Sequence, residues 1–132
     1  MKSILIFLAL CSFAVLAVAD LPPSLKPHSD RFEADRAALT ASAENHLKTP
    51  RDRYLTALTS AEKAATTAGK QQDAVAIAAE MRDVSAGTPA EEFPPDLPRA
   101  LVPQRRDYMT AVATVTTTVP TKLRELADKY LQ

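Results

Sequence analysis

The chain has 132 residues, no Trp and only two Gly, and its 16 basic and 16 acidic residues give a formal net charge of zero. Because a balanced charge leaves no surplus to neutralise phosphates, the composition argues against a nucleic-acid-binding protein and against a basic tract that binds anionic lipid. Two scattered glycines exclude a phosphate-binding glycine loop. Abundant alanine and scarce glycine favour helix throughout one small domain.

Residues 1–19 have the pattern of a secretory signal peptide. Lys2 precedes an apolar run from Ile4 to Leu16, and Ala17-Val18-Ala19 matches a small-residue cleavage site. A retained membrane anchor is the alternative, but the run is short for a bilayer span and no basic stop-transfer cluster follows it. We therefore expect cleavage after Ala19, a secreted or periplasmic protein, and no stable membrane insertion after cleavage.

Cleavage would also change the composition of the mature chain. Its formal charge becomes one negative because Lys2 is removed, and its only cysteine, Cys11, is lost as well. A mature protein without cysteine has neither disulfides nor thiolate metal sites, so packing alone must hold it together.

Two stretches of the sequence share two leucines and two prolines at matching positions: LPPSLKPHSDRF at residues 21–32 and LPRALVPQRRDY at residues 97–108. When these stretches are aligned, Phe32 matches Tyr108, and the same alignment continued without a gap matches Tyr54 with Tyr130. We interpret the chain as an internal repeat. Its parts are a first copy that forms a helical hairpin (20–87), a Pro-rich linker (88–103) and a truncated second copy that forms a single helix (104–132).

The first copy contains an apolar face at helical spacing that runs from Phe32 through Tyr54 and Leu58 to Ala68. Pro50 interrupts this pattern, because proline lacks an N–H and clashes with the preceding turn. Thr49 could serve as a new N-cap there. A kink or a break is therefore expected at Pro50, and likewise at Pro120, and the sequence leaves open which of the two occurs.

Gly69 predicts the end of this first helix, because a residue just past a helix usually takes a positive φ. A second helix follows and ends at Gly87, with an apolar seam that includes Ile77 and Met81. Helices joined by so short a turn lie antiparallel. Alanines are expected on the facing surfaces of this hairpin: Ala57, Ala61, Ala65 and Ala68 against Ala74 and Ala78.

The second copy predicts a third helix over residues 104–131. Its apolar residues are spaced by three or four from Tyr108 to Tyr130. The valines and threonines of residues 111–119 also suit a strand, but a strand would place Val112 and Val115 on opposite faces. The predicted fold class is all-α, an antiparallel helical hairpin plus a third helix, as a three-helix bundle or an elongated coiled coil. Pairing of the last helix with another chain remains the alternative.

The run from Arg53 to Val84 resembles a helical-hairpin unit of uncharacterised secreted bacterial proteins that are rich in alanine. The resemblance covers a Tyr-x-x-x-Leu helix, an Ala-Gly turn and an Ala-rich helix with an acidic residue near its end. The matching positions are Tyr54, Leu58, Ala68, Gly69, Ala74 and Glu80. This resemblance implies a fold and a compartment, and it implies no activity.

No residue pattern in the sequence predicts a catalytic, cofactor or metal site. His28 and His46 are far apart along the chain, and neither has a second histidine at helical spacing. The carboxylates are expected on polar helical faces rather than in a buried pair. We therefore predict that the protein is not an enzyme, with no cofactor and no metal. The residues predicted to matter are structural, with the tyrosine hydroxyls at helix edges: Phe32, Tyr54, Leu58, Gly69, Ile77, Met81, Tyr108 and Tyr130.

The predicted function is an exported, non-enzymatic helical module of the cell envelope, with a structural or protein-interaction role. Its partner would be an unknown protein or a second copy of the chain. One alternative is a periplasmic holdase-type chaperone that clamps clients between helices. A less favoured alternative is a small ligand-binding bundle, which a buried cluster of titratable groups would support and a dry core of Ala, Leu and Val would exclude.

Overall fold

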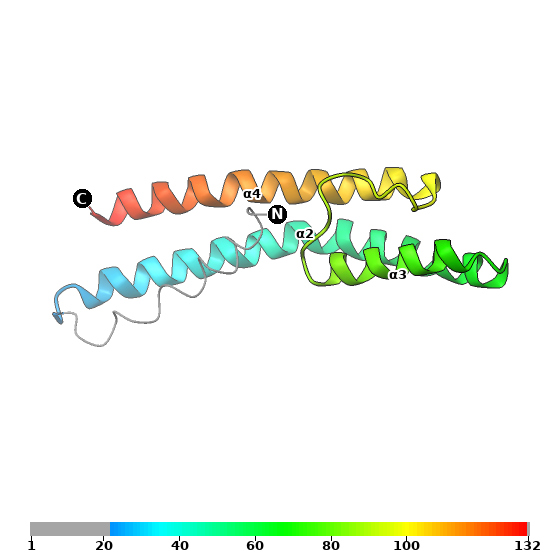
Figure 1. Ribbon diagram of the computed structural model, residues 1–132. Coiled ribbons are helices and arrows are strands. Elements are labelled where there is room, and N and C mark those ends of the chain that lie inside the picture. The colour runs from blue at the N-terminus through cyan, green and yellow to red at the C-terminus, as the bar shows by residue number, and fades with distance from the viewer. Residues whose placement is uncertain (1–21, 132) are drawn as a thin grey trace. The chain divides into compact units, whose positions relative to one another are not determined.

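The computed structural model describes residues 22–131, so the predicted signal peptide and its cleavage site lie outside the described residues. Three α-helices follow one another in this part: α2 (Lys26–Thr67), α3 (Gln71–Ser85) and α4 (Val102–Leu131), with the short 3₁₀-helix η1 (Arg99–Leu101) just before α4 (Figure 1). Residues 22–131 contain no strand. The all-α prediction is therefore confirmed.

The threonine-rich part of α4 shows why helical period outweighs strand propensity. A threonine in a helix can donate its hydroxyl to the carbonyl oxygen one turn earlier. Thr121 does so to the carbonyl oxygen of Thr117 at 3.1 Å, and Thr56 of α2 does so to that of Asp52 at 2.8 Å. These hydroxyls are thus satisfied within the helix.

Neither predicted interruption ends its helix. Pro50 lies inside the 42-residue α2, and Pro120 lies inside the 30-residue α4. Of the two outcomes left open, the break with Thr49 as a new N-cap therefore does not occur. A proline removes one backbone donor, at a cost of about 3 kcal/mol, whereas the regular hydrogen bonds on either side remain. Helix α4 also begins slightly before the predicted start, with Pro103 in its first turn, where a missing N–H has little cost.

Glycines end both helices of the hairpin through the same hydrogen-bond pattern. Gly69 has a φ of 71°, and the N–H of Lys70 donates to the carbonyl oxygen of Ala65 at 2.9 Å. Gly87 has a φ of 73°, and the N–H of Thr88 donates to the carbonyl oxygen of Asp83 at 2.9 Å. This is the Schellman motif, in which a residue of positive φ closes the last turn.

The chain divides into two compact units, each of which combines segments that are distant in the sequence. Within the described residues, unit 1 consists of residues 22–45 and 114–131, and unit 2 consists of residues 46–113. Helices α2 and α4 each contribute a segment to both units, whereas α3 belongs to unit 2. Each unit therefore contains one segment from each predicted copy of the repeat.

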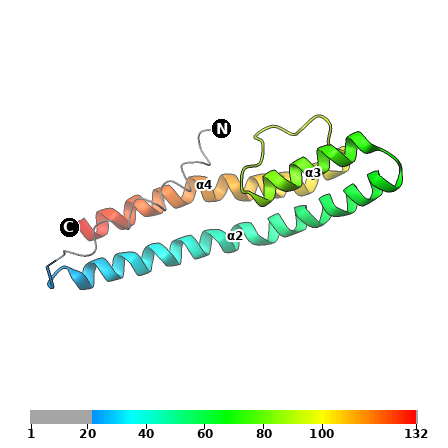
Figure 2. The same cartoon turned by 60° about the horizontal axis from the view of Figure 1, so that its bottom comes forward.

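Unit 2 has a core made by three helices and the linker between α3 and α4. In both views α3 lies beside the C-terminal half of α2 (Figures 1 and 2). Tyr54 and Leu58 of α2 and Ile77 and Val84 of α3 are fully buried. Met81 is half-buried and packs against this core. The remaining buried members of the core are Ala65, Leu97, Leu101 and Tyr108.

The alanine contacts of unit 2 differ in part from those expected. Ala65 is buried, and Ala57, Ala61 and Ala74 pack against the core. Ala68 and Ala78, however, are exposed. Ala68 already belongs to the turn at Gly69, and Ala78 follows Ile77 by one residue, so it points about 100° away from the buried seam. Ala76 packs against the core instead.

Unit 1 is formed by two helical segments, one from α2 and one from α4. Ala43, Val115 and Val119 are its buried residues, and leucines of the same seam, such as Leu39 and Leu123, are only half-buried. When only two helices pack together, each shields one side of the other from solvent and the opposite side stays exposed. A two-helix unit with small buried residues has little hydrophobic stabilisation of its own.

Candidate functional site

A cluster of three polar side chains lies inside the core of unit 2. It consists of Tyr54 from α2, Glu80 from α3 and Arg105 from α4. Tyr54 is fully buried, and Glu80 and Arg105 are only 3% and 5% exposed. We refer to these three residues as the buried cluster. Because ionised groups are rarely buried without partners, its internal contacts decide what it can do.

The carboxylate of Glu80 joins the three helices. Its Oε1 accepts a hydrogen bond from the hydroxyl of Tyr54 at 2.8 Å and another from Nε of Arg105 at 2.9 Å. The second contact is also an ion pair between nearly inaccessible side chains. Charge-assisted hydrogen bonds of this kind are about twice as strong as neutral ones. The cluster therefore ties α3 to α2 and to α4 at one point.

Arg105 extends the cluster to the linker. Its Nη2 donates to the backbone carbonyl oxygens of Ala90 and Glu92, the latter at 3.0 Å. The guanidinium carbon lies 5.7 Å from the centre of the Phe93 ring, within the range of a cation–π interaction. One side chain thus contacts α3 through Nε and the linker through Nη2.

Helical spacing explains why these residues point inward. Glu80 lies three residues after Ile77 and four before Val84, on the same face of α3 as these two buried residues. Arg105 precedes the buried Tyr108 by three residues and shares its face of α4. A charged side chain on a buried helical face needs an opposite charge nearby, and each of the two supplies it for the other.

Burial raises the pKa of the Tyr54 hydroxyl far above its ordinary value, and its hydrogen bond and charge interaction with Glu80 raise it further. The charge of Arg105 lowers it to a smaller extent. The hydroxyl therefore stays protonated at neutral pH and serves as a donor rather than a base or nucleophile. Its buried position also corrects the expectation that this hydroxyl reaches the edge of its helix.

Unit 1 contains a more exposed counterpart. The hydroxyl of Tyr130 donates to Oδ2 of Asp35 at 2.9 Å, and Nζ of Lys129 lies 3.9 Å from the same oxygen. The hydrogen bond to Asp35 raises the pKa of Tyr130. Because solvent screens exposed charges, these contacts contribute far less than those of the buried cluster.

The four aromatic residues singled out from the repeat form two pairs. Tyr54 stacks on Tyr108 with ring centres 5.9 Å apart, and Phe32 meets Tyr130 edge-on at 5.8 Å. Each pair joins one copy of the predicted repeat to the other copy. Within each unit, the segments of α2 and α4 run in opposite directions (Figure 1).

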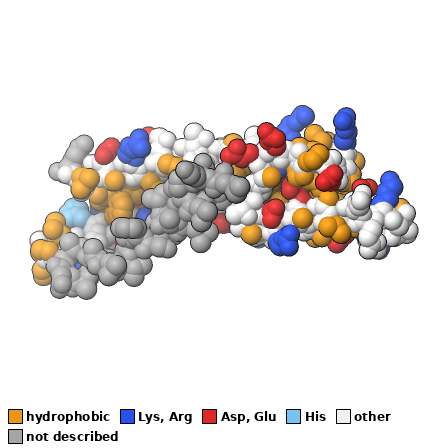
Figure 3. All heavy atoms as spheres, in the orientation of Figure 1, with side chains coloured by type: hydrophobic (Ala, Val, Ile, Leu, Met, Phe, Trp, Pro, Cys, Tyr) orange, Lys and Arg blue, Asp and Glu red, His pale blue; other side chains and the backbone are white. Residues whose placement is uncertain are grey.

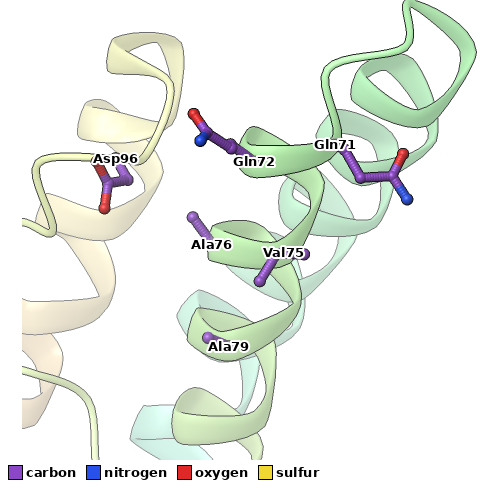
Figure 4. A pocket seen from close by; sticks show the side chains of 6 residues that line it. All are labelled: Gln71, Gln72, Val75, Ala76, Ala79 and Asp96. Carbon is purple, nitrogen blue, oxygen red and sulfur yellow. The ribbon is translucent and has the colours of Figure 1, made fainter.

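Unit 2 also carries two surface grooves. The first has a volume of about 480 Å³ and lies between α3 and Asp96 of the linker (Figure 4). The second, of about 580 Å³, lies between α2 and the start of α4. Residues of the first groove are Gln71, Gln72, Val75, Ala76, Ala79 and Asp96. Residues of the second are Thr49, Asp52, Arg53, Thr56, Ala57, Ser60 and Gln104.

Both grooves carry polar groups of their own, separate from the buried cluster. No member of the buried cluster lines either groove. In the first groove Gln72 points toward the side of Asp96, whereas Gln71 points away from it (Figure 4). In the second, Oε1 of Gln104 is, among the described residues, the single buried side-chain polar atom without a hydrogen-bond partner. Ligand pockets usually combine an enclosed apolar surface with converging polar groups.

The surface around α3 mixes charged side chains of both signs with hydrophobic ones on the face seen in Figure 3. Across residues 22–131, no three His, Cys, Asp or Glu side chains gather closely enough to hold a metal ion. None of the three described helices is both long and apolar enough to cross a membrane.

Sequence reasoning missed the buried cluster. It placed every carboxylate on a polar face and expected a core of small apolar residues, and Glu80 contradicts both expectations. The available signal was the position of Glu80 within the seam formed by Ile77 and Val84. No family model, curated protein or solved structure matches the chain. The site is therefore interpreted from its own geometry.

Proposed function

We propose that this chain is an exported, non-enzymatic helical module that has a structural or protein-interaction role in the cell envelope. The proposal combines the signal-peptide pattern of residues 1–19 with the chemistry of the buried cluster. Its partner is another protein or a second copy of the chain.

The hydrogen bonds within the buried cluster are the observation that supports the non-enzymatic part of this proposal. A buried group of titratable residues is the feature that would favour an enzyme or a ligand-binding bundle. Here, however, the Glu80 carboxylate accepts hydrogen bonds from Tyr54 and Arg105, and Arg105 also donates to backbone carbonyl oxygens of the linker. Tyr54, Glu80 and Arg105 thus bind one another within the core and line neither groove, which supports a structural role for them.

Export is tested by expressing the whole chain in a bacterium and measuring the mass and location of the product. We expect a periplasmic or secreted protein that begins at Asp20. The Ala19→Arg variant is the matched control, because a large charged residue at the cleavage site should leave the precursor uncut. A full-length cytoplasmic product from the unaltered gene would refute the export proposal.

The interaction role is tested separately on the mature protein. A photo-crosslinking residue placed at the exposed Val75, compared with one placed at the exposed Thr118, should give reproducible adducts with one or a few envelope proteins, or with a second copy of the chain. A protein that is monomeric at every concentration and forms no site-dependent adduct would contradict this role.

A holdase-type chaperone is the second candidate, and exposed apolar side chains favour it. Leu25 is 50% exposed, Val75 66% and Leu131 85%. Such side chains can contact unfolded clients. The mature protein should then suppress the aggregation of a heat-denatured model client, and Leu131→Ser should weaken that effect. Absence of protection at a stoichiometric excess would eliminate this candidate.

A further inference from the structure

The linker of unit 2 is held to the helices by very few polar contacts. We call residues 89–97 the strap. It contains no helix or strand and forms an open loop beside α3 (Figure 2). In the described part of the chain, Nη2 of Arg105 ties the strap to α4 through the carbonyl oxygens of Ala90 and Glu92. At the end of the strap, the N–H of Leu97 bonds locally to the carbonyl oxygen of Pro94 at 3.1 Å.

The apolar contacts of the strap lie at its ends and at one point in the middle. Pro89 and Leu97 are buried, and Phe93 is half-buried beneath the guanidinium of Arg105. The two glutamates between Pro89 and Phe93 are exposed. Arg105 and Phe93 therefore form the central attachment of the strap.

The composition of the strap limits what it can do when this attachment is lost. Residues 89, 94 and 95 are prolines, which have no N–H to offer and hold the backbone in extended conformations. Such a segment cannot form replacement hydrogen bonds as a helix or strand would. It moves as a semi-rigid piece when released.

We propose that Arg105 is a latch that holds the strap closed, and that the part of the strap between its buried ends, Pro89 and Leu97, opens while the three helices stay folded. Glu80 is a positioning residue for this latch. Its carboxylate binds Nε of Arg105 and so aims Nη2 at the carbonyl oxygens of the strap. Opening separates Phe93 from Arg105 and uncovers the apolar surface beneath Phe93. This inference goes beyond the proposed function and does not depend on it.

The Arg105→Lys variant separates the latch from the fold. Lysine keeps a positive charge for Glu80, but it lacks the planar fork that binds a carboxylate and two carbonyl oxygens at once. The readout is cleavage of the native chain by a glutamate-specific protease after Glu91 and Glu92, compared with cleavage after Glu62 inside α2. The matched control is Arg106→Lys, which changes the exposed neighbour.

We expect Arg105→Lys to accelerate cleavage of the strap at least tenfold, while cleavage after Glu62 and the helical circular dichroism change less than twofold. Arg106→Lys should alter neither rate. An unchanged strap rate in Arg105→Lys would overturn the proposal. Equal acceleration at the strap and at Glu62 would also overturn it, because the whole unit would then be unfolding.

A second measurement keeps the proposal testable if Arg105→Lys does not fold. The chain has no Trp, so Phe93→Trp places a single fluorescent reporter on the strap and preserves a ring for Arg105. In a denaturant titration, the fluorescence transition should occur at a lower denaturant concentration than the loss of helical circular dichroism. Coincident transitions would show that the strap and the helices open together, and the proposal would be wrong.

Discussion

Replacing Glu80 by Gln tests the role of the buried cluster most directly. Glutamine has nearly the shape of glutamate, and its carbonyl oxygen can still accept two hydrogen bonds, but it carries no charge. The change leaves the guanidinium of Arg105, which is 5% exposed, without its ion-pair partner at 2.9 Å. Tyr54 and Arg105 both donate to the same oxygen of Glu80, which the glutamine carbonyl can replace, so the missing charge is the main loss.

The expected loss follows from these contacts. Removing one partner of a buried ion pair typically costs about 3–5 kcal/mol, because the other charge stays buried. Arg105 keeps its two bonds to backbone carbonyls, so we expect the lower end, about 3 kcal/mol. A domain of this size has a free energy of unfolding of about 5–15 kcal/mol. Glu80→Gln should therefore remove a large fraction of the stability of unit 2.

Urea unfolding followed by circular dichroism measures this loss. Asp83→Asn is the matched control on the same helix, since it removes a carboxylate that is not part of the cluster, and it should change the free energy of unfolding by less than about 0.5 kcal/mol. The triple variant Tyr54→Phe, Glu80→Met and Arg105→Met should recover most of the loss, because neither a charge nor the Tyr54 hydroxyl remains buried without a partner. A loss below about 1 kcal/mol in Glu80→Gln would refute the reasoning, since solvent or another group would then be satisfying Arg105.

Three further predictions concern single positions. Gly69→Ala should destabilise the protein by about 1–2 kcal/mol, because alanine disfavours a φ of 71°. No atom crowds the site, so the backbone strain is the whole cost. In the same thermal unfolding assay, Gly69→Asn should cost less. Because folding raises the pKa of Tyr54, the stabilisation from its protonated hydroxyl is fully present below the ordinary tyrosine pKa of about 10 and is lost as the pH rises above it. In urea titrations at rising pH, Tyr54→Phe should therefore lose less of its free energy of unfolding than the unaltered protein. Tyr108→Ala should cost about 3–5 kcal/mol because its ring is buried in the core, whereas Phe32→Ala, at a half-buried ring, should cost about 1 kcal/mol by chemical denaturation.

The helices and their ends could be predicted from local sequence. The seam of α3 and the stops at Gly69 and Gly87 depend on spacing and on a positive φ, which are properties of a few adjacent residues. The continuity of α2 through Pro50 could not be obtained in this way. A proline weakens a helix locally, but whether the helix ends there depends on the regular hydrogen bonds and packing on both sides.

The buried cluster depends on tertiary structure. Glu80 precedes Arg105 by 25 residues, and a proline-rich linker and a change of helix separate them. Nothing in the local spacing indicates which face of α4 meets α3. A charged residue on an apolar helical face was the available signal, because such a residue must either find a buried partner or force its face outward. With Glu80 on the same face as Ile77 and Val84, the first outcome applies.

A charged pair in this core is better explained by specificity than by stability. The surface that α3 turns toward the core includes Ala74 and Ala76, and small side chains of this kind pack almost equally well when a helix slides or turns by one step. Tyr54, Glu80 and Arg105, by contrast, meet at hydrogen-bonding distance in only one register. Buried polar groups can set register in this way while adding little net stability. The triple variant, with Tyr54→Phe added to the two methionines, separates the two roles: it should keep most of the free energy of unfolding, yet its amide NMR spectrum should show several packing arrangements of α3 instead of one. A single sharp set of resonances would mean that Ile77 and Val84 already suffice to define the register.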